Sequence, residues 1–322
     1  MKTILVSGAS GIVGYGVLRS LQGLGYNLVG TTIYPISPAN CFSDVMLLAP
    51  NTSDEYYFDW LSDVIKKYNV DMIIPCIEAD MIAWNKRRDF LQTLGVCVLL
   101  NNEKLISLCS DKWSFYEELV KNDLPYRIET LISGSFEEIK ERFGLPFLLK
   151  PRCGFASRGI VKVTDKDIFE DNKKNLGTVL MAQPIVGTDD EEYTISAFFD
   201  EDSKLCCYQQ LRRKLSKVGY TEFAETVNLE GIGDVLTRLA SVFKPVGPTN
   251  FQFRMEGNGF KLLEINPRIS SSTSIRTKFG YNEALMSIEY FGKGILPQQV
   301  KQKKGMVIRY TEDFVFLESE GK

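Results

Sequence analysis

The chain has 322 residues, of which 44% are hydrophobic and 25% are charged, so it can bury a large core and form two or three compact units. It contains no histidine, which excludes Ser-His-Asp and Cys-His nucleophilic catalysis and all imidazole metal ligation. The formal net charge of -3, without a basic stripe, argues against a nucleic-acid partner.

The cysteines and the first residues indicate the compartment. Seven cysteines without a Cys-x-x-Cys pair are typical of reduced thiols in a cytoplasmic protein. The apolar run within Met1–Val6 is too short for a signal-peptide core, and no segment approaches the length of a membrane-spanning helix. We therefore expect a cytoplasmic protein without a membrane partner.

The first hundred residues alternate short apolar runs with helical patterns, which is typical of a parallel sheet. The expected strands are Ile4–Val6, Leu28–Gly30, Met72–Ile74 and Val96–Leu99. The expected helical faces are Val13, Val17, Leu21 and Leu24, then Tyr57, Leu61, Val64, Ile65 and Tyr68, then a helix over Met81–Leu94. This region therefore predicts a small doubly wound α/β domain, and a helix over Asp111–Lys121 leads out of it.

A glycine-rich turn, Gly8-Ala-Ser-Gly11-Ile-Val-Gly14, follows the first predicted strand. Such turns bind dinucleotides in many proteins, so an NAD(P)-dependent reductase or epimerase is one alternative function. The supporting residues are missing, because Thr31–Tyr34 offers no acid for a ribose and no tyrosine is followed four residues later by lysine. A tight turn that packs a helix on a strand is the favoured interpretation.

Two acids follow the strand Met72–Ile74, at the edge of a parallel sheet where ligands usually bind. Glu78 and Asp80 could hold a substrate amine, or they could cap the helix that begins near Met81. Helix capping is the favoured interpretation.

A basic loop lies between two predicted strands, Leu145–Leu149 and Ile160–Val163. It combines flexible glycines, a hydroxyl and positive charges that suit phosphate binding, namely Lys150, Arg152, Gly154, Ser157, Arg158 and Gly159. The loop therefore predicts a phosphate site, and a solvated hairpin turn is the alternative.

A second hairpin is predicted about a hundred residues later, where Asn250–Glu256 leads through Gly257-Asn-Gly259 into the strand Phe260–Pro267. Period-two geometry places Leu262, Glu264 and Asn266 on one face of the second strand, and Lys261, Leu263 and Ile265 on the other. With a three-residue loop, Gln252 lies opposite Glu264.

The oxygens of Gln252, Glu264 and Asn266, completed by phosphate oxygens and water, are the hard ligands that Mg²⁺ prefers. A polar strand edge beside a charged turn is the alternative interpretation. The two hairpins together predict a site for a nucleotide and its metal.

With both hairpins in view, the chain resembles the ATP-grasp superfamily and, within it, single-unit relatives of the carbamoyl phosphate synthetase large subunit. The likeness rests on Glu264-Ile-Asn-Pro-Arg-Ile-Ser-Ser-Ser-Thr-Ser274, and on Gln252, where many members carry an acid. It extends from the first strand to about Tyr281, with no matching motif beyond. The implied fold is α/β, with a small parallel-sheet (pre-ATP-grasp, Rossmann-like) domain in residues 1–107 and a two-lobed ATP-grasp unit in residues 108–180 and 181–322.

The resemblance also assigns nucleotide-binding residues. Lys112 and Lys150 would contact phosphates beneath a loop that runs from Cys153 to Gly159 and includes Gly154 and Ser157. Main-chain groups near Gln183 and Ile185 would bind adenine, and Glu192 would bind the ribose hydroxyls. Two departures weaken the adenine site, because Gln183 replaces the usual Glu and Thr188–Glu191 is expanded.

The resemblance further implies that Gln252, Glu264 and Asn266 are metal ligands, and that Arg213 and Arg268 hold the transferred phosphate or the acid that is activated. The implied function is an ATP- and Mg²⁺-dependent carboxylate-amine ligase, with Mn²⁺ able to substitute, that makes an amide through an acyl phosphate. Phosphoryl transfer depends mainly on positioning and cations, which agrees with the absence of histidine.

The expected partners are a small-molecule acid and a small-molecule amine, and a homodimer is left open. Carbamoyl phosphate synthesis itself is not expected, because it would require two grasp units and an ammonia source. The remaining alternative is a non-catalytic ATP-binding regulatory module, which the intact Gln252, Glu264, Asn266 and Arg268 set argues against.

Overall fold

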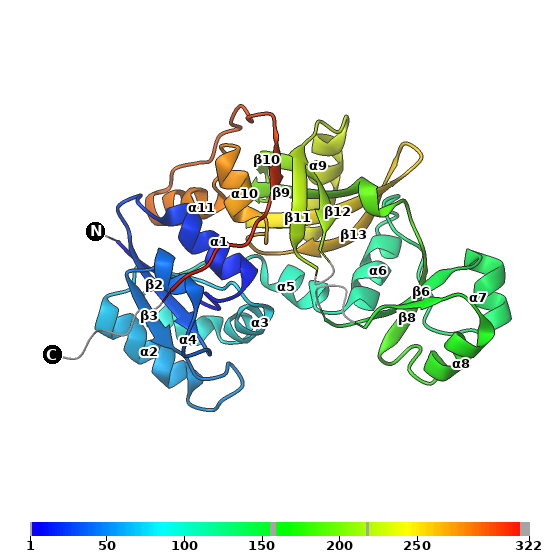
Figure 1. Ribbon diagram of the computed structural model, residues 1–322, viewed down its shortest axis with the longest axis horizontal. Helices are drawn as coiled ribbons and strands as arrows, with labels where there is room; N and C mark the ends of the chain where they lie inside the picture. The colour runs from blue at the N-terminus through cyan, green and yellow to red at the C-terminus, as the bar shows by residue number, and fades with distance from the viewer. Residues whose placement is uncertain (1, 155–158, 217–218, 316–322) are drawn as a thin grey trace. The chain divides into compact units, whose positions relative to one another are not determined.

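A computed structural model describes residues 2–154, 159–216 and 219–315 (Figure 1). By its internal contacts the chain divides into two compact units. Unit 1 comprises Met1–Leu99, Ser271–Ile295 and Met306–Lys322, and unit 2 comprises Leu100–Ser270 and Leu296–Gly305. Within the described ranges, no helix has both the length and the apolar character needed to cross a bilayer.

Unit 1 contains a five-stranded parallel sheet with strand order β3-β2-β1-β4-β5 (Figure 1). Its strands are β1 (Thr3–Val6), β2 (Asn27–Thr32), β3 (Val45–Leu48), β4 (Met72–Ile74), β5 (Cys97–Val98) and, outside this sheet, β14 (Met306–Ile308). Its helices are α1 (Ile12–Leu21), η1 (Pro38–Phe42), α2 (Tyr57–Tyr68), α3 (Glu78–Lys86), α4 (Arg88–Thr93), α10 (Thr273–Lys278) and α11 (Glu283–Lys293). Every residue of β1 and β4 is buried, as expected for central strands covered on both faces.

The predicted parallel α/β domain is confirmed, with two differences. The sheet gains the edge strand β3, which is only partly buried and lacks the continuous apolar burial of the central strands. The prediction of a single helix over Met81–Leu94 is wrong, because Arg87 has non-helical backbone angles, φ -124° and ψ 29°, and separates α3 from α4.

The glycines of the turn after β1 lie in close contact with neighbouring parts of the protein. Gly8 adopts a positive φ of 57°, and a side chain there would collide with Ile77. A Cβ on Gly14 would lie 2.6 Å from the Gly8 carbonyl oxygen and 2.7 Å from the Ala9 Cα, so only glycine lets α1 approach the turn this closely. These contacts support the packing interpretation over a dinucleotide site.

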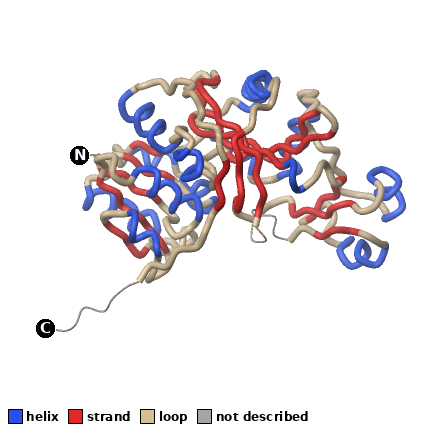
Figure 2. The backbone as a smooth tube through the Cα atoms, turned by 45° about the horizontal axis from the view of Figure 1, so that its top comes forward, coloured by secondary structure: helices blue, strands red, loops and turns tan. Residues whose placement is uncertain are grey.

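Unit 2 contains two sheets. Their strands are drawn in red in Figure 2. The smaller sheet has the order β7-β6-β8, and the larger antiparallel sheet contains β13, β12, β9, β10 and β11 in that order. The strands are β6 (Phe147–Pro151), β7 (Val161–Val163), β8 (Leu180–Pro184), β9 (Glu192–Phe199), β10 (Leu205–Leu215), β11 (Thr221–Thr226), β12 (Gly247–Glu256) and β13 (Gly259–Asn266). The helices are α5 (Glu103–Cys109), α6 (Lys112–Lys121), α7 (Phe136–Phe143), α8 (Lys166–Lys173), η2 (Asp189–Glu191) and α9 (Ile232–Phe243).

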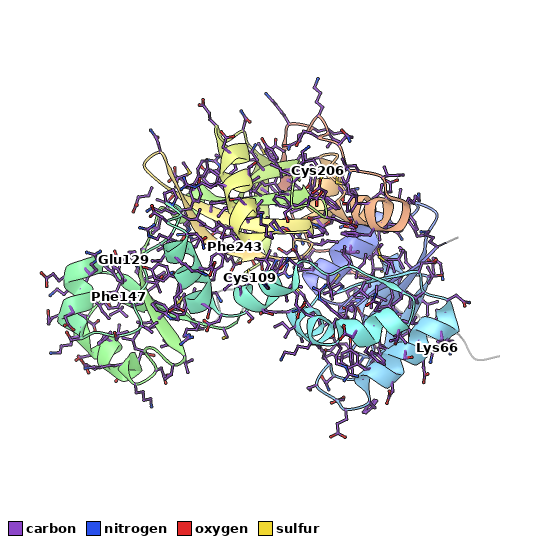
Figure 3. All side chains as sticks on the ribbon, turned by 180° about the vertical axis from the view of Figure 1, so that it is seen from behind. Lys66, Cys109, Glu129, Phe147, Cys206 and Phe243 are labelled. Atoms are coloured by element: carbon purple, nitrogen blue, oxygen red, sulfur yellow. The ribbon has the colours of Figure 1, made fainter. Side chains whose placement is uncertain are left out.

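The smaller sheet packs against α7 and α8 through an aromatic core. The rings of Phe136, Phe147 and Phe169 have centroids 5.9 to 6.4 Å apart, in tilted and edge-to-face arrangements. Phe147 is labelled in Figure 3. Ser135 starts α7 with a capping box, in which its hydroxyl accepts from the Glu138 amide and the Glu138 carboxylate accepts from the Ser135 amide. The expected hairpin of β6 and β7 is confirmed.

The larger sheet has one apolar face and one polar face. Alternate residues of β9, including Tyr193, Ile195, Ala197 and Phe199, enter the core formed with α5, α6 and α9. The residues between them, Glu192, Thr194 and Ser196, lie on the opposite face. That second face is unusual, because its polar side chains are also buried. Buried polar groups need partners, and the candidate site is found there.

Candidate active site

The hairpin of β12 and β13 brings the three predicted metal ligands together. Gln252 pairs directly with Glu264, and Asn250 pairs with Asn266, in the antiparallel register. Directly opposed residues of an antiparallel pair lie on the same face of the sheet, so Gln252 and Glu264 share a face. The predicted juxtaposition is confirmed.

The route to this register differs from the expected one. Glu256 pairs with Gly259, so the loop has two residues, Gly257 and Asn258, where three were expected. The register then shifts between Gln252 and Phe253, which leaves Leu263 unpaired as a β-bulge and restores the Gln252–Glu264 pair. The placement of Leu262 on the face of Glu264 is therefore wrong.

Leu262 lies instead in the apolar core with Ile265, although the two residues are three apart. Without the bulge, residues three apart on a strand would face opposite sides. The extra residue re-aims the strand so that Leu262, before the bulge, and Ile265, after it, both face the core.

Two amide side chains and two arginines surround Glu264. The Asn266 Nδ2 donates to the Glu264 Oε1 at 2.9 Å, and the Arg268 Nη2 donates to the Asn266 Oδ1 at 3.1 Å. The Arg213 Nη2 donates to the Gln252 Oε1 at 2.7 Å. Among the described residues, Glu264 has no ion-pair partner, so its carboxylate keeps charge available for a cation.

The carboxylate and amide oxygens of these residues suit a magnesium ion, but the two amide oxygens are already engaged in hydrogen bonds. Each amide oxygen already accepts a hydrogen bond from an arginine and retains only its second lone pair. Glu264 is the single carboxylate of the set, and the described parts of the chain contain no group of three or more His, Cys, Asp or Glu side chains that could hold a metal ion. A hard cation at Glu264 would therefore need further oxygens, which nucleotide phosphates and water could supply.

Three charged side chains form a row across adjacent strands of the same sheet. Arg213 on β10 pairs with Glu192 on β9, and Glu192 pairs with Arg254 on β12. The Glu192 Oε1 accepts from the Arg213 Nε and Nη2 at 3.1 and 2.8 Å, and the Oε2 accepts from the Arg254 Nη2 at 3.1 Å. Glu192 is 5% exposed, so the arginines provide the partners that a buried carboxylate requires.

Lys150, on β6, belongs to the same group of charges. Burial lowers the pKa of the Lys150 amine, Lys112 and Arg254 act in the same direction, and Glu264 and Glu192 oppose them. The Lys112 Nζ donates to the Gly154 carbonyl oxygen at 2.7 Å, at the start of the basic loop. The structure thus brings Lys112, Lys150, Glu192 and Glu264 into one electrostatic neighbourhood.

The glycines at the ends of the basic loop adopt positive φ angles, 115° at Gly154 and 75° at Gly159. Ser157 and Arg158 lie outside the described residues. Arg152, expected to supply charge to phosphates, forms an ion pair with Asp111 and donates to the Gly177 carbonyl oxygen at 2.7 Å. Its charge is therefore balanced within the protein.

The predicted adenine-binding segment joins β8 to β9. The Gln183 Nε2 donates to the Thr130 hydroxyl at 2.8 Å, and the Gln183 side chain is buried. Ile185 is 40% exposed, so an apolar side chain is available beside the strand end. Gly187 has a positive φ of 59°, and a Cβ there would lie 2.7 Å from the Met255 carbonyl oxygen, so this segment packs tightly on β12.

In unit 1, Asp80 has internal partners. Its Oδ1 accepts from the Thr52 hydroxyl at 2.5 Å and from the Tyr57 hydroxyl at 2.8 Å, and the side chain is 3% exposed. Asp80 and Glu78 both lie in the first turn of α3, where negative charge stabilises a helix. This arrangement supports the structural interpretation of Asp80 over substrate binding.

Arg254 is a residue of the site that sequence reasoning missed. It follows Gln252 by two positions on β12, so period-two geometry places both on one face. The sequence indicated Arg254 only by its charge and its position two residues after the predicted ligand Gln252. Its partner Glu192 could not be predicted without the register between β9 and β12.

Two family models match the chain. Residues 180–314 match "ATP-grasp in the biosynthetic pathway with Ter operon", and residues 14–99 match "PylC-like, N-terminal domain". The C-terminal part of the chain thus matches an ATP-grasp family model, and the N-terminal part matches a PylC-like one. The first match continues past Tyr281, where the resemblance was expected to end.

The chain is also similar to curated carbamoyl phosphate synthase large chains. The carbamoyl phosphate synthase large chain of Methanosarcina acetivorans is 22% identical over 286 residues, which cover 81% of this chain and 26% of that protein. The N-terminal section of the Aquifex aeolicus large chain is 20% identical and covers 86% of this chain and 55% of its own length. The chain thus spans about a quarter to a half of the length of these relatives.

Several solved structures share the fold of this chain. N5-carboxyaminoimidazole synthetase from Staphylococcus aureus, complexed with ADP, superposes with a TM-score of 0.74 at 16% identity and covers 94% of this chain and 80% of its own. The L-amino acid ligase from Bacillus licheniformis gives a TM-score of 0.68 at 17% identity, and the match covers 91% of this chain and 74% of the ligase chain. The predicted α/β fold, a parallel-sheet domain followed by an ATP-grasp unit, is confirmed.

Proposed function

We propose that the protein is an ATP- and Mg²⁺-dependent carboxylate-amine ligase that forms an amide through an acyl phosphate. The observation that carries this proposal is the shared face of Gln252, Glu264 and Asn266 beside Lys150 and its neighbouring charges. The family match supports ATP as the nucleotide, and the fold is one that carboxylate-amine ligases use.

The charge of the site suits a polyanion. The site holds four cations, Lys112, Lys150, Arg213 and Arg268, and two carboxylates, Glu192 and Glu264, an excess of two positive charges. The charge of Arg254 is balanced by Asp189. A desolvated lysine such as Lys150 gains most from an anionic partner, because its charge is poorly solvated. Nucleotide phosphates would satisfy this excess.

Each residue has a separate role in the proposed site. Lys112 and Lys150 bind nucleotide phosphates, Glu192 accepts from the ribose, and main-chain groups near Gln183 and Ile185 bind adenine. Glu264, with Asn266 and Gln252, holds Mg²⁺, or Mn²⁺ in its place. The metal, when bound, supplies positive charge against the phosphate oxygens.

Arg268 and Arg213 bind the phosphoryl group or the acid. A carboxylate oxygen of the substrate attacks the γ-phosphorus, the bond to ADP breaks, and an acyl phosphate forms. A neutral amine then attacks the acyl carbon, loses a proton and expels phosphate. Arg268 is the better placed donor, because Arg213 is 5% exposed and already balanced by Glu192.

The proposed substrates are a small acid and a small amine, and the proposed location is the cytoplasm. All seven cysteines lie within the described residues as free thiols, which supports a reducing compartment. The three-part division at residues 107 and 180, and a homodimer, stay predictions.

An ADP-release screen of amino acids and sugar acids, each paired with amines, tests the reaction. With the correct acid, hydroxylamine should trap a hydroxamate while ADP and phosphate accumulate in equal amounts. Release of AMP and pyrophosphate would instead establish adenylation and contradict the acyl phosphate. Nucleotide binding without turnover across the screen would favour a regulatory module.

A further inference from the structure

Arg254 contacts Val186, Asp189 and Glu192, which lie in and next to the segment that would receive the adenosine of the nucleotide. We propose that Arg254 is a nucleotide-positioning residue, which holds the Glu192 carboxylate and the connection between β8 and β9 in the arrangement that binds adenosine. This inference rests on the proposed function, because it concerns the same nucleotide site.

The first observation is the number of elements that the guanidinium joins. The Arg254 Nη2 donates to the Glu192 Oε2 at 3.1 Å and to the Asp189 Oδ1 at 2.7 Å. The Nη1 donates to the Val186 carbonyl oxygen at 3.4 Å. One side chain on β12 thus holds the start of β9 and two positions of the preceding connection.

The second observation is how the three arginine bonds divide over Glu192. Both bonds from Arg213 reach the Oε1, and the bond from Arg254 reaches the Oε2. Two carboxylate oxygens offer about four acceptor sites in all, so the Oε2 keeps one for a hydroxyl of the nucleotide. Arg254 fixes the direction of the carboxylate and leaves that acceptor unused.

The third observation is that stability alone accounts poorly for an arginine at this position. The Arg254 Nε is buried without a hydrogen-bond partner among the described residues, and the Asp189 carboxylate is 92% exposed, where an ion pair contributes little. Buried donors without partners are uncommon in folded proteins and need a reason. A role in aligning Glu192 and the connection between β8 and β9 explains the arginine, because that role uses the two Nη atoms and does not require the Nε to have a partner.

The chain offers a matched control next to Arg213. Arg212 precedes it on β10 and forms an ion pair with Glu225 on β11. Its side chain is 44% exposed, and as a neighbour of Arg213 along the strand it points to the other face of the sheet. Replacement of Arg212 removes one arginine and one ion pair without touching the nucleotide site.

The experiment compares Mg-ADP with Mg-tripolyphosphate, which carries the phosphate charge but no adenosine. Calorimetric affinities are measured for the intact chain and for Arg254→Met, Arg254→Lys and Arg212→Met. We expect Arg254→Met to weaken ADP binding at least about tenfold relative to the wild type, which is the effect of losing one charge-assisted hydrogen bond. The affinity of the same variant for tripolyphosphate should stay within about twofold of the wild-type value. Arg254→Lys should recover part of the ADP affinity, and Arg212→Met should match the wild type.

Equal weakening of both ligands by Arg254→Met, or unchanged ADP affinity, would overturn the inference. If Arg254→Met does not fold, Arg254→Lys decides, because unchanged ADP affinity in that variant would overturn the inference equally. Failure of the proposed function is detected separately, because the wild-type chain would then either bind neither ADP nor tripolyphosphate or bind ADP without turnover in the ADP-release screen.

Discussion

Gln252 lies directly opposite Glu264 because an unpaired leucine compensates for a short hairpin loop. The two-residue loop alone would place Gln252 opposite Leu263, on the face away from Glu264. The bulge at Leu263 adds one residue to β13 and returns Glu264 to the shared face. The geometry of the candidate metal site thus depends on Leu263 lying outside the ladder, and not on a contact that Leu263 makes.

Deletion of Leu263 should therefore leave the Gln252–Glu264 pair of the candidate metal site intact. Without it, Phe253 still pairs with Leu262 and Gln252 still pairs with Glu264, in a regular ladder. We expect the Mg-dependent rise in melting temperature with ADP to persist in this variant. Its loss in a folded protein would show that the extra twist at the bulge, and not the register alone, aims Glu264.

Glu192→Gln should destabilise the protein strongly. The change leaves the buried Arg213 guanidinium without its carboxylate, and removal of one member of a buried pair costs about 3–5 kcal/mol. Asp189→Asn is the control, because its exposed pair with Arg254 is worth about 0–1 kcal/mol. Urea unfolding of both variants measures the difference, and similar small losses would contradict the buried network.

The Asp111–Arg152 pair should contribute stability that acid removes. Burial alone would raise the pKa of the Asp111 carboxyl, but hydrogen bonds from Arg152 and from the Trp113 amide outweigh it and lower the pKa below its ordinary value. A lowered folded-state pKa adds stability above the unfolded value of about 3.9, and that stability is lost as the pH falls through the folded value. The stability gap between wild type and Asp111→Asn should therefore close with acid, and a gap that persists would contradict this assignment.

Lys150 should make nucleotide affinity depend on pH. Burial lowers the pKa of its amine, so the positive charge is lost at a lower pH than in an exposed lysine. We expect ADP affinity to fall as the pH rises through that lowered value, and Lys150→Met to bind weakly at every pH without this dependence. A pH profile that is the same in wild type and Lys150→Met would assign the titration to another group.

Local patterns were sufficient to predict four strands of the parallel sheet, the β6–β7 hairpin and the β12–β13 hairpin with its polar residues. The alternation of residues along Phe260–Asn266 placed Glu264 and Asn266 on one face, and the run before Gly257 placed Gln252 near them. Regular β geometry links such residues through spacing alone. Glycine spacing likewise predicted the turn after β1, and its conformation supports the packing interpretation.

Features that depend on partners distant in sequence could not be predicted. The bulge at Leu263 is specified by how Leu262 and Ile265 both reach the core, which strand composition does not reveal. The pairing of Glu192 with Arg254 requires β9 to lie beside β12, although 62 positions separate the two residues. The internal neutralisation of Arg152 by Asp111 depends in the same way on two segments that meet only in the fold.

The most direct test of the proposed metal site is the Mg²⁺-dependent stabilisation by ADP of wild type and Glu264→Gln. Ligand at about 100 times its dissociation constant stabilises a folded protein by about 2.7 kcal/mol, which is readily detected as a rise in melting temperature. Glu256→Gln is the control, since Glu256 lies on the same hairpin and its side chain is 60% exposed beside Lys261. We predict that Mg²⁺ increases the ADP-induced rise in wild type and Glu256→Gln but not in Glu264→Gln; an equal Mg²⁺ effect in all three would contradict the metal site.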